Sequence, residues 1–378
     1  MLYRQNVLFL GNYTANQGTN VKRKIHALLG AASLILSFQA SALTFNTFVS
    51  SSSLNGAVGN DDAIGFAYAG NKFVGSIYFN NQLYQTDLNG QNAQKFGAAL
   101  PIDSGVAGEI YVSSSLGLGG FASRSVFAGS EKSGTVWSFA NNATTSTAAT
   151  SFVTGLSGGV RSIAFDPYGN YGNDMIVATN AGNVYRINSL GATDLLASGL
   201  GDTEGLDFTP QQFGNIPAGT LVVLSEGSGR VRAISPQKVV TDLGLQFNTP
   251  EMISFVPLDF AQTLNPLAGF YAARYPDEVV KANYTDFSAY AGQAIVTEEG
   301  THDIYAISWD GSQNKFLSTF VGDLGGQPED GIFVTAAILD PGCTARPGGC
   351  NNLPEPGSLA LLGLGLAGLA SLRGKRLA

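Results

Sequence analysis

Short apolar runs alternate with polar turns along residues 174–188, whose sequence is DMIVATNAGNVYRIN. The apolar runs 175–177 and 184–187 flank a turn that contains Asn180, Gly182 and Asn183. Asn and Gly adopt left-handed backbone conformations readily, and β-branched and aromatic residues favour extended strands. The pattern therefore predicts a tight β-hairpin.

The same hairpin pattern recurs along the chain. Copies occupy residues 125–140, 220–235 and 293–308, and a looser copy occupies residues 73–87. Their second strands align at Tyr84, Trp137, Tyr185, Arg232 and Tyr305. The first four of these positions are spaced roughly fifty residues apart, a period typical of β-propeller blades.

A further apolar strand precedes each hairpin, and weaker fourth strands follow it. Four of the preceding strands align by a Phe, at residues 161–165, 204–208, 251–255 and 329–333. The first strand of a propeller blade lines the central channel, so its first residue should lie on one rim. These rim positions hold Arg161, Glu204, Glu251 and Glu329, with Glu109 at the matching place in the second blade and Asp62 near the start of the first.

We therefore expect an all-β β-propeller with five visible blades and room for a sixth. In one scheme the strand at 329–337 supplies the inner strand of the first blade, so that strands from both ends of the chain close the ring and leave no exposed edge. In the other scheme residues 62–69 start the first blade, which leaves room for a degenerate sixth. Residues 257–290 contain several aromatic residues, among them Phe270, Tyr271, Tyr275 and Tyr284, and we expect this segment to be an insertion in the fifth blade that covers one face.

Two short sequence segments of the repeat region resemble segments of NHL and SMP-30-type six-bladed propellers. They are Glu204-Gly-Leu-Asp-Phe208 and Phe165-Asp-Pro-Tyr-Gly169-Asn170. The resemblance extends over only a few residues in each blade. It implies a metal ion on the channel axis held by acidic side chains, although the Asn and catalytic Asp of the SMP-30 hydrolases have no match here.

The start of the chain predicts a secretory signal peptide. A basic cluster at residues 22–24 precedes the apolar run 27–38 and the small-residue site formed by Ala40 and Ala42. A core helix is the alternative. The mature protein is expected to begin near Leu43, and translation is expected to start at Val21.

The end of the chain carries three ordered features. Pro354-Glu355-Pro356 is followed by the uncharged stretch 357–372 and then by Arg373, Lys375 and Arg376. The stretch predicts a short apolar helix of about 24 Å, with the basic residues on the cytoplasmic side of a membrane.

This order resembles the PEP-CTERM sorting signal of Gram-negative bacteria. The resemblance implies recognition and cleavage by an exosortase-type membrane protease, and transient anchoring in the inner membrane. A plain C-terminal anchor is the alternative. The predicted organisation is then an N-terminal extension and signal peptide (1–42), the propeller (43–340), a Cys-containing linker (341–353) and the sorting segment (354–378).

Composition narrows the functional classes. The whole chain has a net charge of −8, and the body without its basic ends is more acidic still. No block of basic residues occurs in that body, which excludes a nucleic-acid footprint. The only two cysteines, Cys343 and Cys350, enclose a short Pro- and Gly-containing loop, and an oxidising compartment favours a local disulfide between them.

The sequence offers little for catalysis. The body beyond residue 42 contains one histidine, His302, in a predicted hairpin turn, and no nucleophile elbow, zinc-protease motif or phosphate-binding loop occurs. No catalytic residue is assigned.

Carboxylates are the better candidates for a site. Glu204, Glu251 and Glu329 should converge at the channel rim, and oxygen ligands of this kind suit Ca²⁺. The alternative is that each Glu caps backbone amides at the start of its own strand. Residues 166–174, DPYGNYGND, suit either a turn cluster or a Ca²⁺ loop.

The function expected from the sequence is that of an exported binding or structural protein of the envelope or extracellular matrix. Extracellular polysaccharide or biofilm is its expected setting, as the tail resemblance implies. One alternative is a calcium-dependent lactonase- or esterase-like hydrolase of the SMP-30 type, and another is a structural surface protein without a ligand.

Overall fold

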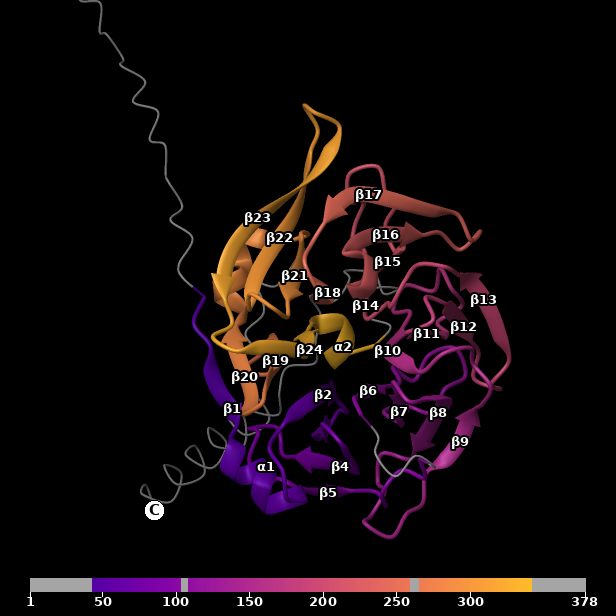
Figure 1. Cartoon of the computed structure of the whole chain (residues 1–378), viewed down its shortest axis with the longest axis vertical. Helices are drawn as coiled ribbons and strands as arrows, with labels where there is room; N and C mark the ends of the chain where they lie inside the picture. Colours follow the sequence, from indigo (N-terminus) through magenta and orange to yellow (C-terminus); the bar gives the residue numbers. More distant parts are fainter. Residues whose placement is uncertain (1–42, 103–107, 259–264, 342–378) are drawn as a thin grey trace, which may run out of the picture. The chain divides into compact units, whose positions relative to one another are not determined.

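The described strands form six antiparallel four-stranded sheets, arranged as blades around a central channel (Figure 1). The computed structural model describes residues 43–102, 108–258 and 265–341. The all-β propeller prediction is confirmed, and the number of blades is six rather than the five seen as hairpins. In these residues the helices are short: α1 is Ser51–Val58 and α2 is Ala336–Leu339, with 3₁₀ turns η1 at Glu226–Ser228 and η3 at Tyr284–Tyr290.

The first four blades each use four consecutive strands, counted from the channel outwards. Blade one contains β2 (Ala63–Tyr68), β3 (Phe73–Ile77), β4 (Asn80–Thr86) and β5 (Gln94–Phe96). Blade two contains β6 (Ile110–Ser114), β7 (Val126–Ser130), β8 (Ser133–Phe139) and β9 (Thr150–Val153). Blade three contains β10 (Val160–Phe165), β11 (Met175–Thr179), β12 (Val184–Ile187) and β13 (Thr193–Ala197). Blade four contains β14 (Gly205–Phe208), β15 (Leu221–Ser225), β16 (Arg230–Ile234) and β17 (Val240–Gln246).

The last two blades interleave in the sequence. Blade five contains β18 (Pro250–Phe255), β21 (Ala294–Glu298), β22 (Asp303–Asp310) and β23 (Lys315–Asp323). Blade six contains β24 (Gln327–Val334), β19 (Gly269–Tyr275), β20 (Glu278–Asn283) and, outermost, β1 (Asn46–Val49). The sixth blade therefore joins strands from both ends of the propeller, so the ring closes in this blade and not in the first.

Two expectations about this region need correction. The part of this segment from β19 to β20 does not cover a face of the fifth blade, because β19 and β20 are the middle strands of blade six. Phe270 and Tyr271 are fully buried there instead of facing solvent. The strand at 329–333 is the inner strand of blade six and not of blade one. The first blade starts with β2, as the scheme with residues 62–69 at its start predicted.

The predicted alignment of the hairpins is confirmed by the strand register. Each aligned residue lies on the third strand of its blade, opposite a central residue of the second strand. The pairs are Tyr84 with Gly75, Trp137 with Ala128, Tyr185 with Val177, Arg232 with Val223, and Tyr305 with Val296.

The hydrophobic core is divided into sectors between blades. Each of the six clusters of buried side chains joins two neighbouring blades, as Phe66 and Phe73 of blade one join Tyr271 of blade six. Second strands are therefore buried on both faces, which explains why they are continuous apolar runs without alternation. This arrangement leaves the axis of the ring free for a channel.

Candidate functional site

The acidic rim residues predicted from the sequence lie at the same end of the channel. Glu109 and Glu204 immediately precede the inner strands β6 and β14, while Arg161, Glu251 and Glu329 lie near the starts of β10, β18 and β24. Inner strands of successive blades are neighbours around the ring. Asp62 precedes β2, and its carboxylate accepts a hydrogen bond from Asn60 Nδ2 at 3.0 Å.

Arg161 is the buried cation of this rim. Its guanidinium forms ion pairs with Glu109 and Glu204, and its Nη2 lies 3.1 Å from Glu226 Oε2. It also lies 3.4 Å from Asp202 and 3.6 Å from Glu131. The side chain of Arg161 is only 7% exposed, so these contacts are poorly screened by water.

Tyr111 joins the rim residues of two blades. Its hydroxyl lies 2.9 Å from Glu109 Oε2 and 3.1 Å from Glu204 Oε1, so its single proton is shared between these two acceptors. The Arg161 guanidinium lies 5.4 Å from the Tyr111 ring centroid. Burial, followed by the nearby Glu251 and Glu109 carboxylates, raises the pKa of Tyr111 well above its usual value. Its phenol is therefore a fixed hydrogen-bond donor at neutral pH.

Several acidic residues of the rim were not identified from the sequence. Glu131, Glu226 and Glu299 directly follow the second strands of blades two, four and five, and Asp202 lies just before Glu204. Three of these acids could have been found from the aligned hairpins, because each precedes the aligned third-strand residue by the same number of positions. They are Glu131 before Trp137, Glu226 before Arg232, and Glu299 before Tyr305. The rim therefore has an inner layer of strand residues and an outer layer of turn residues.

The rim carries more negative charge than Arg161 neutralises, and the pKa values reflect this. Burial and the neighbouring Glu131 carboxylate raise the pKa of Glu109 to about 7. Burial, followed by repulsion from Glu251, raises the pKa of Glu329 well above its usual value. Burial also raises the pKa of Glu251 well above its usual value, against the opposing effect of Arg161. Part of the rim therefore holds protons near neutral pH.

The rim only partly fits the calcium site predicted from the sequence. Glu204, Glu251 and Glu329 reach the same end of the channel, but Glu204 is paired with Arg161. In the described part of the chain, the acids that bring one oxygen each within 4.8 Å of one another are Asp202, Glu204 and Glu226. All three contact the Arg161 guanidinium, so a Ca²⁺ ion bound among them would lie beside a positive charge. The calcium assignment stays a prediction.

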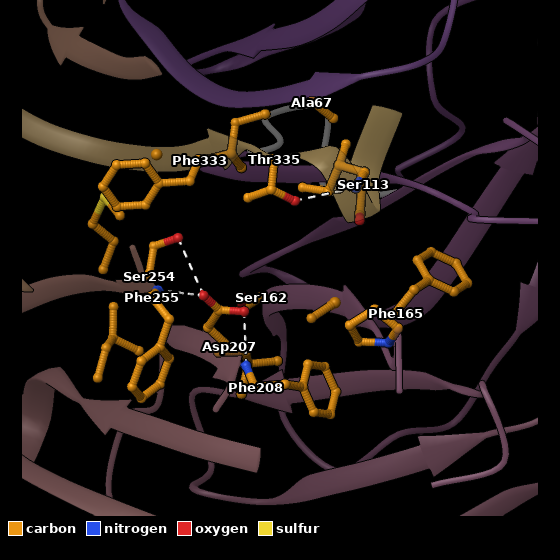
Figure 2. A pocket seen from close by; sticks show the side chains of 18 of the residues that line it. Ala67, Ser113, Ser162, Phe165, Asp207, Phe208, Ser254, Phe255, Phe333 and Thr335 are labelled. Atoms are coloured by element: carbon orange, nitrogen blue, oxygen red, sulfur yellow. Dashed lines mark hydrogen bonds between the residues drawn. The ribbon is translucent and has the colours of Figure 1, made fainter. Parts of the chain in front are cut away.

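A cavity of about 570 Å³ runs along the channel (Figure 2). Its lining follows the inner strands from end to end, from Glu204 to Phe208 on β14 and from Glu251 to Phe255 on β18. At the end opposite the acidic rim it is lined by Pro167, Pro210, Pro257 and residues of α2. The volume is in the range of pockets that bind small organic molecules.

Two aspartates of the cavity wall tie neighbouring inner strands together. The Asp207 carboxylate accepts hydrogen bonds from Phe255 N at 2.5 Å, Ser254 Oγ at 3.2 Å and Phe208 N at 2.7 Å, as Figure 2 shows. Asp330 accepts a hydrogen bond from Phe66 N at 3.1 Å and so joins blade six to blade one. Burial raises the pKa of Asp207 to about 6 and that of Asp330 to about 7.

The short helix α2 lies at the second end of the cavity. Figure 1 shows it at the centre of the ring of blades, and Ala336, Ala337 and Ile338 line the cavity. Thr335 caps the helix by accepting a hydrogen bond from Ile338 N at 3.1 Å. Arg124 Nη2 donates to the carbonyl oxygens of Ile338 and Leu339, which fixes the C-terminal end of the helix to blade two.

Two other sequence candidates have structural roles. Asp166 is buried, and its carboxylate accepts backbone hydrogen bonds from Tyr168, Gly169, Tyr171 and Asn173, so it organises the 166–174 turn from within. His302 lies in the turn between β21 and β22, as predicted. Ala40, Ala42, Cys343, Cys350 and the sorting residues Pro354, Glu355, Pro356, Arg373, Lys375 and Arg376 lie outside the described residues. Within the described residues, no helix has the length and apolar character needed to cross a bilayer.

Comparison with protein families identifies the end of the chain. Residues 352–376 match the PEP-CTERM protein-sorting motif. This motif implies an exported protein that is transiently anchored in a membrane at its C-terminus and processed by exosortase, a membrane enzyme. No curated protein matches the sequence.

Several solved structures resemble the propeller. A nidogen/laminin complex aligns with 13% identity and a TM-score of 0.48, covering 73% of this chain and 86% of that one. A streptogramin B lyase aligns with 11% identity and a TM-score of 0.43, again covering 73% and 86%. A catalytically inactive virginiamycin B lyase from Staphylococcus aureus with quinupristin aligns with 10% identity and a TM-score of 0.43, covering 76% and 77%. Similarities at this level carry no information about the ligand of this chain.

Proposed function

We propose that this chain is an exported binding protein whose ligand site is the cavity along the propeller channel. The observation that carries the proposal is the cavity itself, with its volume of about 570 Å³. Apolar and aromatic side chains such as Phe165, Phe208 and Phe333 line it together with hydroxyls such as Ser113 and Thr335. A concave, mostly apolar site with a few converging polar groups is the usual anatomy of a small-molecule site.

The setting that we propose is the outer envelope or extracellular matrix of a Gram-negative cell, with extracellular polysaccharide or biofilm as the surrounding material. The sorting motif supports this placement, because it implies export and processing at a membrane. Intact-mass measurement of envelope-fraction protein should give a chain that starts near Leu43 and lacks most residues after Pro356. A full-length chain that still carries residues 357–378 would contradict the placement.

The binding role is tested by filling the cavity. Replacing Ser113 by Phe places a ring in the cavity, whereas replacing the exposed Ser146 by Phe leaves the cavity unchanged. We expect wild type and Ser146→Phe to retain small oligosaccharides or metabolites from a culture extract, as detected by native mass spectrometry, and Ser113→Phe to lose them. Equal retention by all three proteins would remove the cavity as the site and favour a structural protein without a ligand.

A second candidate function is a calcium-dependent hydrolase of lactones or esters. The observation in its favour is that Glu204, Glu251 and Glu329 reach one end of the cavity from three inner strands. Calorimetric titration with CaCl₂ should then give heat, and Ca²⁺ should raise the melting temperature with concentration. The absence of both effects would eliminate the hydrolase, and calcium binding without lactone turnover would leave the ion a structural role.

A further inference from the structure

The charged side chains that line the cavity are all of one sign. Among the described lining residues there is no Lys, Arg or His. The charged lining residues are Glu204, Asp207, Glu251, Glu329 and Asp330. Low-dielectric walls that carry acids alone concentrate negative charge inside a channel when these acids ionise, so the cavity disfavours anions and favours cations.

Glu251 is the lining carboxylate to which no described residue gives a hydrogen bond or an ion pair, and Oε2 of Glu204 is a buried lining oxygen without a hydrogen-bond partner among the described residues. Glu204 is paired with Arg161 and accepts from Tyr111, and Glu329 Oε1 accepts from Gln327 Nε2 at 2.7 Å. Glu251 is only 4% exposed and lines the cavity, yet no described residue gives it a hydrogen bond or an ion pair. Because Glu251 lines the cavity and has no protein donor, a positively charged donor from a ligand in the cavity could bind it.

The wall beyond Glu251 is suited to the apolar part of such a ligand. Towards α2 the lining consists mainly of aromatic rings from five blades and of small apolar side chains, with isolated hydroxyls and the Asp207 carboxylate. The aromatic rings are Tyr68, Phe165, Tyr168, Phe208, Phe255 and Phe333. Aromatic faces bind both apolar groups and alkylammonium groups, whose charge they stabilise without requiring many oxygen ligands.

We propose that the cavity binds an organic monocation, a primary ammonium compound whose NH₃⁺ group pairs with Glu251 and whose apolar body extends along the inner strands towards α2. The proposal rests on the binding function proposed above and names the ligand class of the same site. An ammonium group has three donors, so it can bond to Glu251 and also reach Glu329 from the same position.

A single positive charge suits this end of the cavity better than a divalent ion does. Ca²⁺ takes six to eight oxygen ligands, whereas Glu204 and Glu329 already have partners and Glu251 offers only two oxygens. The Arg161 guanidinium also lies beside Glu204 and would repel a divalent ion more strongly than a monocation.

Binding of the ammonium group should release a proton. Burial holds the pKa of Glu251 well above its usual value, and a cation beside the carboxylate stabilises the ionised form. Affinity should therefore increase as pH rises through this raised pKa. The charged and titratable groups that face Glu251 are Arg161 on β10, Glu109 and Tyr111 at β6, Glu226 in η1, Glu299 after β21 and Glu329 on β24.

The test uses protein purified from the envelope fraction and three probes of similar shape. Phenethylammonium carries the positive charge, 2-phenylethanol is its neutral counterpart, and 3-phenylpropionate carries a negative charge. We expect calorimetry to give at least about tenfold tighter binding of the ammonium probe than of the alcohol, and no detectable binding of the carboxylate. Titration in two buffers of different ionisation enthalpy should detect the released proton.

Two substitutions locate the effect. Glu251→Gln should abolish the preference for phenethylammonium while leaving the affinity for 2-phenylethanol unchanged. Glu131→Gln removes a carboxylate of the same rim that does not line the cavity, and it should keep most of the preference. A CaCl₂ titration on the same proteins shows whether a metal competes for Glu251.

The possible results separate the two proposals. Equal binding of all three probes would refute the ammonium site and leave the cavity as a binding site. Binding of none of them would overturn both the ammonium site and the cavity function for ligands of this size. If Glu131→Gln loses the preference for phenethylammonium as strongly as Glu251→Gln does, the preference is a general effect of rim charge. That result would refute the pairing of the ammonium group with Glu251. If the wild type binds Ca²⁺ but not phenethylammonium, and Glu251→Gln no longer binds Ca²⁺, the site is a metal site.

Discussion

Arg161 stabilises an acidic rim that is otherwise self-repelling. Arg161 of blade three is the cation shared by five carboxylates that lie in, or directly before, blades two and four: Glu109, Glu131, Asp202, Glu204 and Glu226. A buried ion pair is a weak source of net stability, but removing one partner leaves uncompensated buried charge. The contribution of Arg161 therefore depends on how many of these acids are ionised.

We predict that Arg161→Gln lowers the free energy of unfolding by about 3–5 kcal/mol at neutral pH. The loss should shrink in acid, because the protonated carboxyl groups no longer repel one another. Urea unfolding at several pH values measures both effects. Arg186→Gln is the control, because the Arg186 side chain is 35% exposed and pairs with the partly exposed Asp194, and it should cost less than about 1 kcal/mol. Equal losses in the two variants would contradict the role of Arg161.

The raised pKa of Asp207 should make the propeller more stable in acid than at neutral pH. Burial raises its pKa in the folded state to about 6 from an ordinary value of 3.8. Between these values the folded protein binds more protons than the unfolded chain, so this group stabilises the fold in acid. Its contribution is lost as pH rises through about 6.

In the wild type, ionisation of Asp207 should lower the unfolding free energy by up to about 3 kcal/mol between pH 4 and pH 7. We predict that Asp207→Asn removes this decrease. Urea unfolding across that range measures the slope. Asp242→Asn changes an exposed acid paired with Arg230 on the outside of blade four and should leave the slope as in wild type. An unaltered slope in Asp207→Asn would mean that Asp207 is ionised throughout.

At the scale of the blade, buried aromatic residues determine how sheets pack. Tyr84 on β4 lies opposite Gly75 on β3, and a side chain at Gly75 would collide with the Tyr84 ring, so the ring occupies the space that glycine leaves. Among the described residues, nothing accepts or donates a hydrogen bond at the Tyr84 hydroxyl. Tyr171 is equally buried, but its hydroxyl donates to the Ile234 carbonyl and accepts from Leu221 N at 3.0 Å.

We predict opposite outcomes for the same substitution at these two tyrosines. Tyr84→Phe removes an unsatisfied buried hydroxyl and should leave the unfolding free energy unchanged or raise it by about 1 kcal/mol. Tyr171→Phe removes two hydrogen bonds and leaves a carbonyl and an amide unpaired, so it should lower the unfolding free energy by about 1–3 kcal/mol. Thermal unfolding distinguishes them, and a destabilised Tyr84→Phe would show that its hydroxyl has a partner.

At the scale of the whole propeller, β1 closes the ring. Val49 of β1 is fully buried and belongs to the cluster that joins blade six to blade one. The Phe48 ring lies 4.8 Å from Tyr271 in blade six and 5.0 Å from Phe73 in blade one. Closure also covers the outer edge of β20, which would otherwise present unpaired backbone groups to other chains.

We predict that Val49→Asp opens this closure. A carboxylate has no partner in the apolar cluster, so the substitution should cost about 3 kcal/mol or more and expose the β20 edge. Thr47→Asp is the control on the same strand, because Thr47 is exposed and should tolerate the charge. Size-exclusion chromatography should show association of Val49→Asp but not of Thr47→Asp. A soluble, monomeric Val49→Asp of normal stability would show that β1 contributes little to closure.

The sequence by itself determined the features that local chemistry specifies. Hairpins such as 174–188 depend on turn residues and on neighbouring apolar runs, so their positions and their alignment at Trp137 and Tyr185 were predictable. The rim position of Glu204, Glu251 and Glu329 followed from the repeat, because equivalent residues of a cyclic fold lie at equivalent places. The sorting motif at 352–376 is linear and was recognised for the same reason.

The tertiary structure decided what depends on contacts between distant segments. β19 and β20 lie between the first and second strands of blade five in the sequence, and only their pairing with β24 and β1 makes them part of blade six. Similarly, the contacts of Arg161 with Glu131 and Glu226 require three blades to be side by side. The cavity and the unpartnered Glu251 arise only when the inner strands surround an axis. Pairing, charge neutralisation and enclosed volume are properties of the closed ring, which no single repeat contains.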